Sequence, residues 1–285
     1  MILVFGQSGQ VAKELQSHRH VVTLGRGQVD LCIPQTCVEA IRRYKPCAVI
    51  NAAAYTAVDN AEQEEQLANA INGYAPGAIA SACFAQGIPL VHISTDYVFD
   101  GSGTTPWSVS DIPNPQNAYG RSKLKGEQAI KASGCIHAIL RTSWVVSAHG
   151  NNFIKTMRRL SKTRDRITVV DDQIGGPTCA RDIAWTCLSI AEQLIQDPRK
   201  SGTYHYAGQP NVSWYQFANV LFEEMKCKTF MSPIQTQNYP TPALRPLNSR
   251  LDCKITCNTF GVVRPFWQDG VRKILGELDA EDYEA

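Results

Sequence analysis

The chain has 285 residues, of which 44% are hydrophobic and 19% are charged, so it can bury a sizeable core and is not expected to be disordered. Its length corresponds to about two domains or to one large α/β domain. Lys and Arg number 28 and Asp and Glu number 26, and the resulting net charge of +2 gives no indication of a protein that binds nucleic acid or a membrane surface.

Short apolar runs alternate with helical patterns along the first half of the chain. The apolar runs predict strands at 2–5, 21–24, 48–50, 88–93 and 136–140, and the patterns between them predict helices at 9–17, 34–45, 59–86 and 117–133. Strands that are apolar throughout and separated by helices are typical of a parallel sheet covered on both faces. The sequence therefore predicts a doubly wound, Rossmann-type α/β fold.

The pattern becomes less regular after residue 145. Helices are predicted at 151–163, 179–196 and 213–226, and short strands at 166–170 and 203–206. Residues 238–242 contain two prolines and cannot lie inside a helix. We expect residues 146–285 to form mainly a smaller substrate-binding lobe, with some segments returning to the sheet.

Ten cysteines stand out in the composition. None forms a Cys-x-x-Cys pair, and the sequence shows neither a signal peptide nor an apolar run of about 18 residues. We therefore expect unpaired cysteines in a reduced, cytoplasmic protein.

The turn after the first predicted strand is glycine-rich. Its sequence, Gly6-Gln7-Ser8-Gly9-Gln10-Val11-Ala12, has the spacing Gly-x-x-Gly-x-x-Ala rather than the Gly-x-Gly-x-x-Gly of the dinucleotide fingerprint. Glycines let the backbone turn tightly against a pyrophosphate, while the following helix turns its free N–H groups toward the negative charge. The spacing alone is a weak signal, but its place as the first turn after a strand favours a dinucleotide site.

The second predicted strand ends at Leu24-Gly25-Arg26, where an acid would bind the ribose of NAD. No acid is present, and an arginine suits a 2′-phosphate, so Arg26 favours NADPH over NADH unless it is simply a solvated surface residue. Asp30 could still contact the adenosine. We expect residues 1–145 to form an NADP-binding domain.

Tyr119 and Lys123 lie four residues apart and therefore on one face of a predicted helix. A phenol has an ordinary pKa of about 10, and a neighbouring ammonium lowers it, so such a pair can protonate a carbonyl oxygen that accepts hydride. The stretch Ser94-Thr95-Asp96 directly follows a predicted strand, at the edge where α/β sheets bind ligands. A hydroxyl there could share the substrate oxygen with Tyr119.

These motifs and several others make the chain similar to the dTDP-4-dehydrorhamnose reductase family of extended short-chain dehydrogenase/reductases. The resemblance covers nearly the whole chain in order. It rests on FGQSGQV (5–11), NAAAYTAVD (51–59), STDYVFDG (94–101), YGRSKLKGE (119–127), RTSWV (141–145), GNNF (150–153), DQIGGPT (172–178) and the segment from YPTP (239–242) to NSRL (248–251). It implies NADPH-dependent reduction of the 4-keto group of dTDP-4-dehydro-β-L-rhamnose to dTDP-L-rhamnose, for a bacterial surface polysaccharide such as the lipopolysaccharide O-antigen.

The resemblance also implies roles for individual residues. Tyr119 matches the proton donor, Lys123 its activator and a ligand of the nicotinamide ribose, and Thr95 the hydroxyl that tunes the tyrosine and contacts the sugar. Asp96 and Trp144 match substrate contacts. The positions that match cofactor contacts are Gly9, Gln10 and Val11 at the pyrophosphate, Asp30 and Leu31 at the adenine, and Ala54, Tyr55 and Thr56 beyond the third strand.

Partners follow from the same resemblance. The substrate would be a dTDP-4-keto-6-deoxy sugar, with NADPH, or else NADH, as cofactor, and with neither nucleic acid nor membrane as partner. Some members hold Mg²⁺ at a dimer contact, and Glu14 matches one of the ligands. The resemblance therefore allows a homodimer and a Mg²⁺ ion without requiring either.

Several alternatives stay open at this point. The chain could reduce another dTDP-4-keto-6-deoxy sugar, giving for example 6-deoxy-L-talose, or act as a non-catalytic NADP-binding regulatory subunit of a methionine adenosyltransferase. Intact Thr95, Tyr119 and Lys123 argue against the second. Trp144 could instead be a core aromatic, and Thr95 and Asp96 could cap a turn. The arginines 245 and 250 could face the substrate pyrophosphate or be structural.

Overall fold

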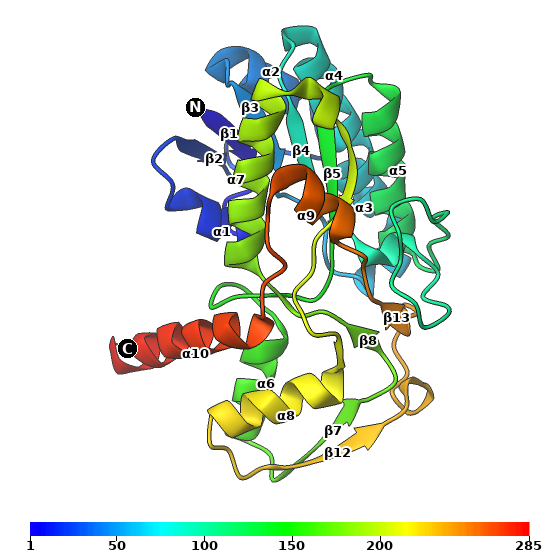
Figure 1. The fold of residues 1–285 in the computed structure, drawn as a ribbon, viewed down its shortest axis with the longest axis vertical. Helices are drawn as coiled ribbons and strands as arrows, with labels where there is room; N and C mark the ends of the chain where they lie inside the picture. The colour runs from blue at the N-terminus through cyan, green and yellow to red at the C-terminus, as the bar shows by residue number, and fades with distance from the viewer. Residues whose placement is uncertain (285) are drawn as a thin grey trace.

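Six parallel strands form the central sheet in the upper half of the computed structural model, which describes residues 1–284 (Figure 1). The strands are β1 (Ile2–Phe5), β2 (Val21–Leu24), β3 (Ala48–Asn51), β4 (Leu90–Thr95), β5 (His137–Thr142) and β10 (Gly202–His205), in the order β10-β5-β4-β3-β1-β2. Every neighbouring pair is parallel, so all the carboxyl ends lie at one edge. The sheet confirms the predicted doubly wound α/β fold.

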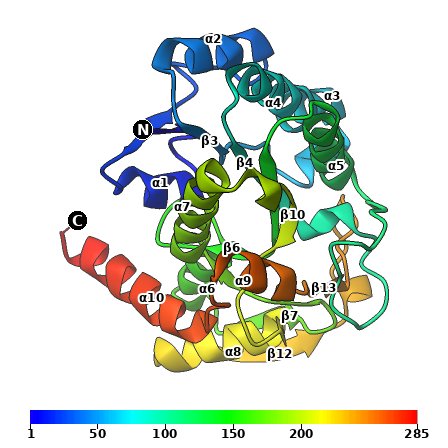
Figure 2. The same cartoon turned by 45° about the horizontal axis from the view of Figure 1, so that its top comes forward.

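Helices cover both faces of this sheet (Figure 2). One face carries α1 (Gln10–Gln16), α7 (Ala180–Gln196) and α9 (Lys254–Phe260); the other carries α2 (Pro34–Tyr44), α4 (Ala75–Gln86) and α5 (Ala118–Ala132). Side chains alternate along a strand, so Ile2 and Val4 pack with α1 and α7 whereas Leu3 and Phe5 pack with α2 and α4. Because helices cover both faces of the strand, the side chains on both faces are buried. The strand therefore consists of apolar residues throughout.

The single helix predicted at 59–86 is broken into several pieces. A short 3₁₀ turn (Asn60–Glu62) precedes α3 (Glu65–Asn69), a π-helical turn spans Ala70–Tyr74, and α4 follows with Pro76 in its first turn. Proline has no N–H to donate to the helical hydrogen bonds, so the helix changes to a wider π turn before Pro76. The break also frees the Asn72 side chain, which exchanges hydrogen bonds with the backbone of Tyr55 near the sheet edge.

The later part of the chain forms a second layer below the carboxyl edge of the sheet in Figure 1. A hydrophobic cluster packs its helices together. These helices are α6 (Phe153–Ser161), α8 (Trp214–Glu224) and α10 (Trp267–Glu284), joined by the strands β6 (Val145–Val146), β7 (Arg166–Val170), β8 (Ile174–Gly175), β9 (Thr178–Cys179), β11 (Val212–Ser213), β12 (Phe230–Ile234) and β13 (Asn248–Ser249). Strand β10 lies beyond residue 145 and completes the sheet beside β5.

Sequence reasoning missed β12, α9 and α10, and also the two-residue strands β6, β8, β9, β11 and β13. Helix α10 carries a signal that could have revealed it, because its buried side chains Trp267, Val271, Ile274, Leu275 and Leu278 recur at helical spacing. All ten cysteines are free, as predicted. Within residues 1–284, no helix combines the length and the apolar character needed to cross a membrane.

Candidate active site

A cavity of about 840 Å³ opens along the carboxyl edge of the sheet. The turns after β1, β2, β3, β4 and β5 all contribute to its wall, as expected for ligand sites of doubly wound folds. The cofactor and substrate residues predicted from the sequence all line it: Gly6, Gly9, Gln10, Val11, Arg26, Asp30, Leu31, Ala54, Tyr55, Thr56, Thr95, Asp96, Tyr119, Lys123 and Trp144. Glu14 lies elsewhere.

The glycine turn after β1 brings backbone close to backbone. Gly6 has a φ of +116°, and a Cβ placed there would lie 3.2 Å from the Ala53 nitrogen after β3. Helix α1 starts next to Gly9, which offers no side-chain cap, so its first N–H groups have no competing side-chain acceptor. This end of the cavity therefore fits the pyrophosphate of a dinucleotide.

The turn after β2 forms another stretch of the wall. The Cys32 N–H donates a hydrogen bond to Asp30 at 2.9 Å and lowers the pKa of that carboxyl. Arg26 is exposed in the same turn, and its positive charge lowers the pKa further. Asp30 is thus an ionised acceptor, and Arg26 a cation available at the rim. The pair suits a ligand with hydroxyls and a phosphate.

Helix α5 carries Tyr119 and Lys123 to the end of β4. Its first turn is capped by Asn117, whose Oδ1 accepts a hydrogen bond from the Gly120 N–H at 2.7 Å. A Cβ at Gly120 would lie 2.2 Å from the Tyr97 carbonyl oxygen, and one at Gly126 would lie 2.1 Å from the Asn72 carbonyl oxygen. These two glycines let the helix press against its neighbours and place its reactive face in the cavity.

Tyr119 is half-buried beside Thr95. Burial raises the pKa of the phenol to about 12, although a hydrogen bond with Thr95 acts in the opposite direction. The Thr95 hydroxyl donates to Asp96 Oδ1 at 3.1 Å and accepts from the Tyr97 N–H at 3.2 Å. Tyr119 therefore holds its proton at neutral pH in a position where a ligand oxygen could receive it.

Lys123 is 2% exposed, and its Nζ donates to the Ile93 carbonyl oxygen at 2.7 Å. Burial lowers the pKa of this ammonium to about 8, and the carboxylate of Glu127 one turn later opposes that shift. At neutral pH the side chain still carries most of its charge. It can therefore stabilise a phenolate that forms on Tyr119.

His92 in β4 touches Lys123 from behind, with 3.3 Å between Nε2 and Nζ. Asn51 accepts from the Ala53 N–H through Oδ1 and turns its Nδ2 toward His92 Nδ1, at 3.1 Å. Burial and the charge of Lys123 hold the pKa of His92 well below its ordinary value. Sequence reasoning did not assign His92 to the site, and a lone imidazole in an apolar strand was its only signal.

Two polar atoms in the cavity wall are buried and have no protein partner. They are Asp96 Oδ2 and Thr142 Oγ1, and Thr142 stands opposite Thr95 in the register of β4 and β5. Burial raises the pKa of Asp96 to about 6. Buried polar atoms normally find a partner, so both are available to the hydroxyl or amide groups of a ligand. Thr142 was not predicted.

Trp144 lies in a slot between two elements of the lower layer. It has a φ of +50°, and its indole stacks on Trp214 of α8 at 3.5 Å between ring centroids and 8° between planes. A Cβ at Gly175 would lie 2.8 Å from the indole Cε2. The side chain is half-buried and forms part of the cavity wall, so it combines packing in the lobe with access to a ligand.

The two later arginines with open roles lie outside the residues that line the cavity. Arg245 pairs with Asp59 at 2.8 Å, and its other terminal nitrogen is buried without a protein partner. Arg250 donates to Asn248 Oδ1 at 3.0 Å. Arg245 thus keeps one donor for a ligand, whereas Arg250 has a structural contact.

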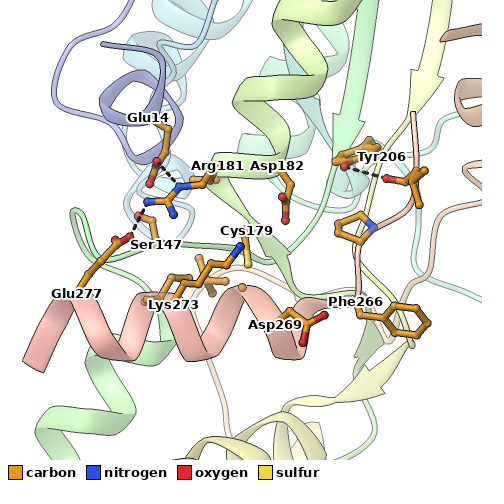
Figure 3. A pocket seen from close by; sticks show the side chains of 16 residues that line it. Glu14, Ser147, Cys179, Arg181, Asp182, Tyr206, Phe266, Asp269, Lys273 and Glu277 are labelled. Carbon is orange, nitrogen blue, oxygen red and sulfur yellow. Dashed lines mark hydrogen bonds and ion pairs between the residues drawn. The ribbon is translucent and has the colours of Figure 1, made fainter. Parts of the chain in front are cut away.

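Glu14, the metal ligand implied by the resemblance, lies on α1 in contact with Arg181 (Figure 3). The Nε of Arg181 is 3.2 Å from Glu14 Oε2, and its Nη2 is 2.5 Å from Glu277 Oε1. In the described part of the chain, no three His, Cys, Asp or Glu side chains gather closely enough to hold a metal ion. A guanidinium is a donor and a cation, so these residues do not fit Mg²⁺.

Comparison with known proteins gives close matches over the full length. Residues 1–280 match the family described as the RmlD substrate binding domain. The chain is 40% identical to a dTDP-4-dehydrorhamnose reductase of Sinorhizobium fredii over 100% of this chain and 99% of that protein, and 40% identical to one of Escherichia coli over 97% of each.

Solved structures give the same result. The chain resembles a dTDP-4-dehydrorhamnose reductase of Clostridium acetobutylicum, with a TM-score of 0.90, 35% identity and coverage of 98% of this chain and 99% of that one. It also resembles the Bacillus anthracis dTDP-4-dehydrorhamnose reductase in complex with NADP, with a TM-score of 0.89, 34% identity and coverage of 97% and 98%.

Proposed function

Because this chain belongs to the dTDP-4-dehydrorhamnose reductase family, we propose that it reduces the 4-keto group of dTDP-4-dehydro-β-L-rhamnose with NADPH, giving dTDP-L-rhamnose. The observation that carries the proposal is the convergence of Thr95, Tyr119 and Lys123 in one cavity whose other end is the glycine turn. The test is consumption of NADPH with this substrate, followed by NMR of the product.

The geometry suits hydride reduction of a ketone. The glycine turn, Gly6 to Val11, would hold the pyrophosphate of NADPH, and NADPH would supply the hydride when bound. Tyr119 donates its proton to the sugar oxygen, Thr95 shares that oxygen through its hydroxyl, and Lys123 stabilises the phenolate. Asp96 Oδ2 and Trp144 hold the sugar, since the first is an unpaired acceptor and the second an open aromatic edge. General acid catalysis of this kind contributes about 10²–10⁴-fold.

The product distinguishes this proposal from the related reductases. Reduction from the opposite face would give a 6-deoxy-talose product, and NMR of the reduced sugar separates the two. A regulatory subunit without activity would bind NADPH and show no turnover with any dTDP-4-keto sugar. The same assay therefore separates all the alternatives.

The organisation of the chain supports further parts of the proposal. Residues 1–145 supply the turns at the cofactor end and also Thr95, Asp96 and Trp144, so we assign cofactor binding and these substrate contacts to the first part. The later residues support substrate binding by packing Trp214 against Trp144, and this is the role we propose for the smaller lobe. We also propose a cytoplasmic location, supported by the ten free cysteines. A homodimer stays a prediction, and sedimentation analysis would test it.

We expect kcat/KM to depend on pH with two limits. The ammonium of Lys123 has a pKa of about 8 and is the active form, so activity should fall as the pH rises above 8. The carboxylate of Asp96 has a pKa of about 6 and is the form that accepts a sugar hydroxyl, so activity should also fall below pH 6.

The Asp96→Asn variant is the control for the lower limit. It should lose the acidic limb of the profile and keep the alkaline one, with a raised KM. A wild-type profile that stays flat from neutral pH to pH 10 would contradict the role given to Lys123.

Arg26→Ser should weaken NADPH binding by about tenfold, since a charge-assisted hydrogen bond to phosphate contributes about 1.5–3 kcal/mol and exposure reduces it. Binding of NADH, which has no 2′-phosphate, should change little. Arg42→Ser is the matched control, because Arg42 is an exposed arginine on α2 outside the cavity. Equal losses for NADPH and NADH in Arg26→Ser, measured by fluorescence titration, would show that Arg26 does not read the phosphate.

A further inference from the structure

Three helices from both layers of the molecule meet at Arg181 (Figure 3). This residue lies in the first turn of α7, and its guanidinium reaches Glu14 of α1 at 3.2 Å and Glu277 of α10 at 2.5 Å. The two carboxylates use different nitrogens, Nε and Nη2, of the same planar group. One cation therefore joins two anions that belong to different helices.

The close approach of α10 is built into the backbone. A Cβ at Gly270 would lie only 2.1 Å from the Cys179 sulfur at the start of α7, so a glycine is required there. Glu277 lies two helical turns further along α10, on the side that faces Arg181 in Figure 3. Glu14 keeps only 10% of its side chain exposed, so its charge is poorly screened and needs a neighbouring cation.

At this junction two carboxylates surround a positive charge, and the guanidinium of Arg181 supplies that charge. A Mg²⁺ ion needs carboxylate, carbonyl or water oxygens around it. Here a guanidinium stands between Glu14 and Glu277, Lys273 adds a second positive charge to the same pocket, and the hydrogen bonds that Arg181 donates to Glu277 and Glu14 raise its pKa. A divalent cation between Glu14 and Glu277 would meet these two positive groups, and the other carboxylates of the pocket, Asp182 and Asp269, do not gather with a third ligand from the described residues closely enough to hold a metal ion.

We propose that Arg181 replaces a divalent metal ion in this chain, and that its guanidinium, without bound metal, ties α10 to the sheet. The link joins two separate cores, because α1 and α7 pack in the cluster on the sheet whereas α10 packs in the cluster of the lower layer. Since α1 begins at the glycine turn, the same link steadies the cofactor end of the cavity against the lobe.

Thermal unfolding tests this proposal without reference to activity, so it succeeds or fails separately from the proposed reaction. Wild-type protein should show the same melting temperature in EDTA and in millimolar MgCl₂ at matched ionic strength. Arg181→Gln should melt about 2–4 °C lower in both buffers, because it leaves the two carboxylates without a cation. Arg181→Glu should melt lower still in EDTA and regain stability when MgCl₂ is added, because the change completes a set of carboxylates.

Arg42→Glu is the matched control. It makes the same charge change at an exposed arginine of α2 that has no ion pair with a described carboxylate, so it completes no set of carboxylates and its melting temperature should not respond to MgCl₂. A wild-type protein that loses stability in EDTA and regains it with MgCl₂ would overturn the proposal. So would Arg181→Gln with an unchanged melting temperature. If Arg181→Glu does not fold, the melting temperatures of the wild type and of Arg181→Gln still test the proposal.

Discussion

Tyr119→Phe should lose about 10²–10⁴-fold in kcat and still bind NADPH with nearly unchanged affinity. The substitution removes only the phenolic oxygen, which is the proposed proton donor. The ring stays packed at its edge against Tyr97, with 5.6 Å between centroids. The Thr95 hydroxyl keeps its contacts with Asp96 and the Tyr97 N–H, so no buried group loses its last partner. The measurements are steady-state NADPH oxidation and fluorescence titration with NADPH.

Tyr206→Phe is the control for this prediction. Tyr206 is a buried tyrosine, and its hydroxyl donates to the Val263 carbonyl oxygen at 3.3 Å, outside the cavity. Its removal should leave kcat within about twofold of wild type. A Tyr119→Phe enzyme with wild-type turnover would show that another group protonates the sugar.

Glu127→Ala should reduce the free energy of unfolding by about 3–5 kcal/mol, because it leaves the guanidinium of Arg141 buried and unpaired. The pair is 0% and 1% exposed and bidentate, with nitrogen–oxygen distances of 2.9 and 2.6 Å. Ser94 donates to the same carboxylate at 2.6 Å, so its hydroxyl would also lose an acceptor. Urea-induced unfolding measures the loss.

The exposed pair between Glu65 and Arg121 provides the matched control. Its side chains are 41% and 44% exposed, and Glu65→Ala should change stability by less than about 1 kcal/mol. Replacing both members of the buried pair, in Glu127→Leu with Arg141→Met, should recover part of the loss, because no charge then stays buried. Equal stabilities for Glu127→Ala and Glu65→Ala would contradict this account of the core.

The position of Glu127 also links stability to the site. It lies one helical turn beyond Lys123, and its charge opposes the effect of burial on the pKa of that lysine. In the folded Glu127→Ala protein the pKa of Lys123 should be lower than in wild type. The fall in kcat/KM at alkaline pH should therefore begin at a lower pH. The buried pair is thus part of what keeps Lys123 charged.

Local patterns in the sequence were sufficient for most of the sheet and for the centre of the site. The strands of the sheet were predicted because runs such as 2–5 must face helices on both sides. Tyr119 and Lys123 could be paired because a helical spacing of four residues puts them on one face. The break at Pro76 was the main error in the first half, since a proline inside an apolar helical pattern was not given enough weight.

Contacts between distant segments were decided only by the tertiary structure. Asn51 and His92 are 41 residues apart and meet because β3 and β4 are neighbours; His92 Nδ1 contacts Asn51, and Nε2 contacts Lys123. Glu14 and Arg181 are 167 residues apart, and no spacing rule relates them. The sequence by itself determined the fold class, the glycine turn and the Tyr119–Lys123 pair, because each depends on neighbours along one element. The partner of each buried charge was decided by packing, because an electrostatic interaction depends on distance in space. This holds for Glu14, whose partner is Arg181 and, as we propose, not a metal ion.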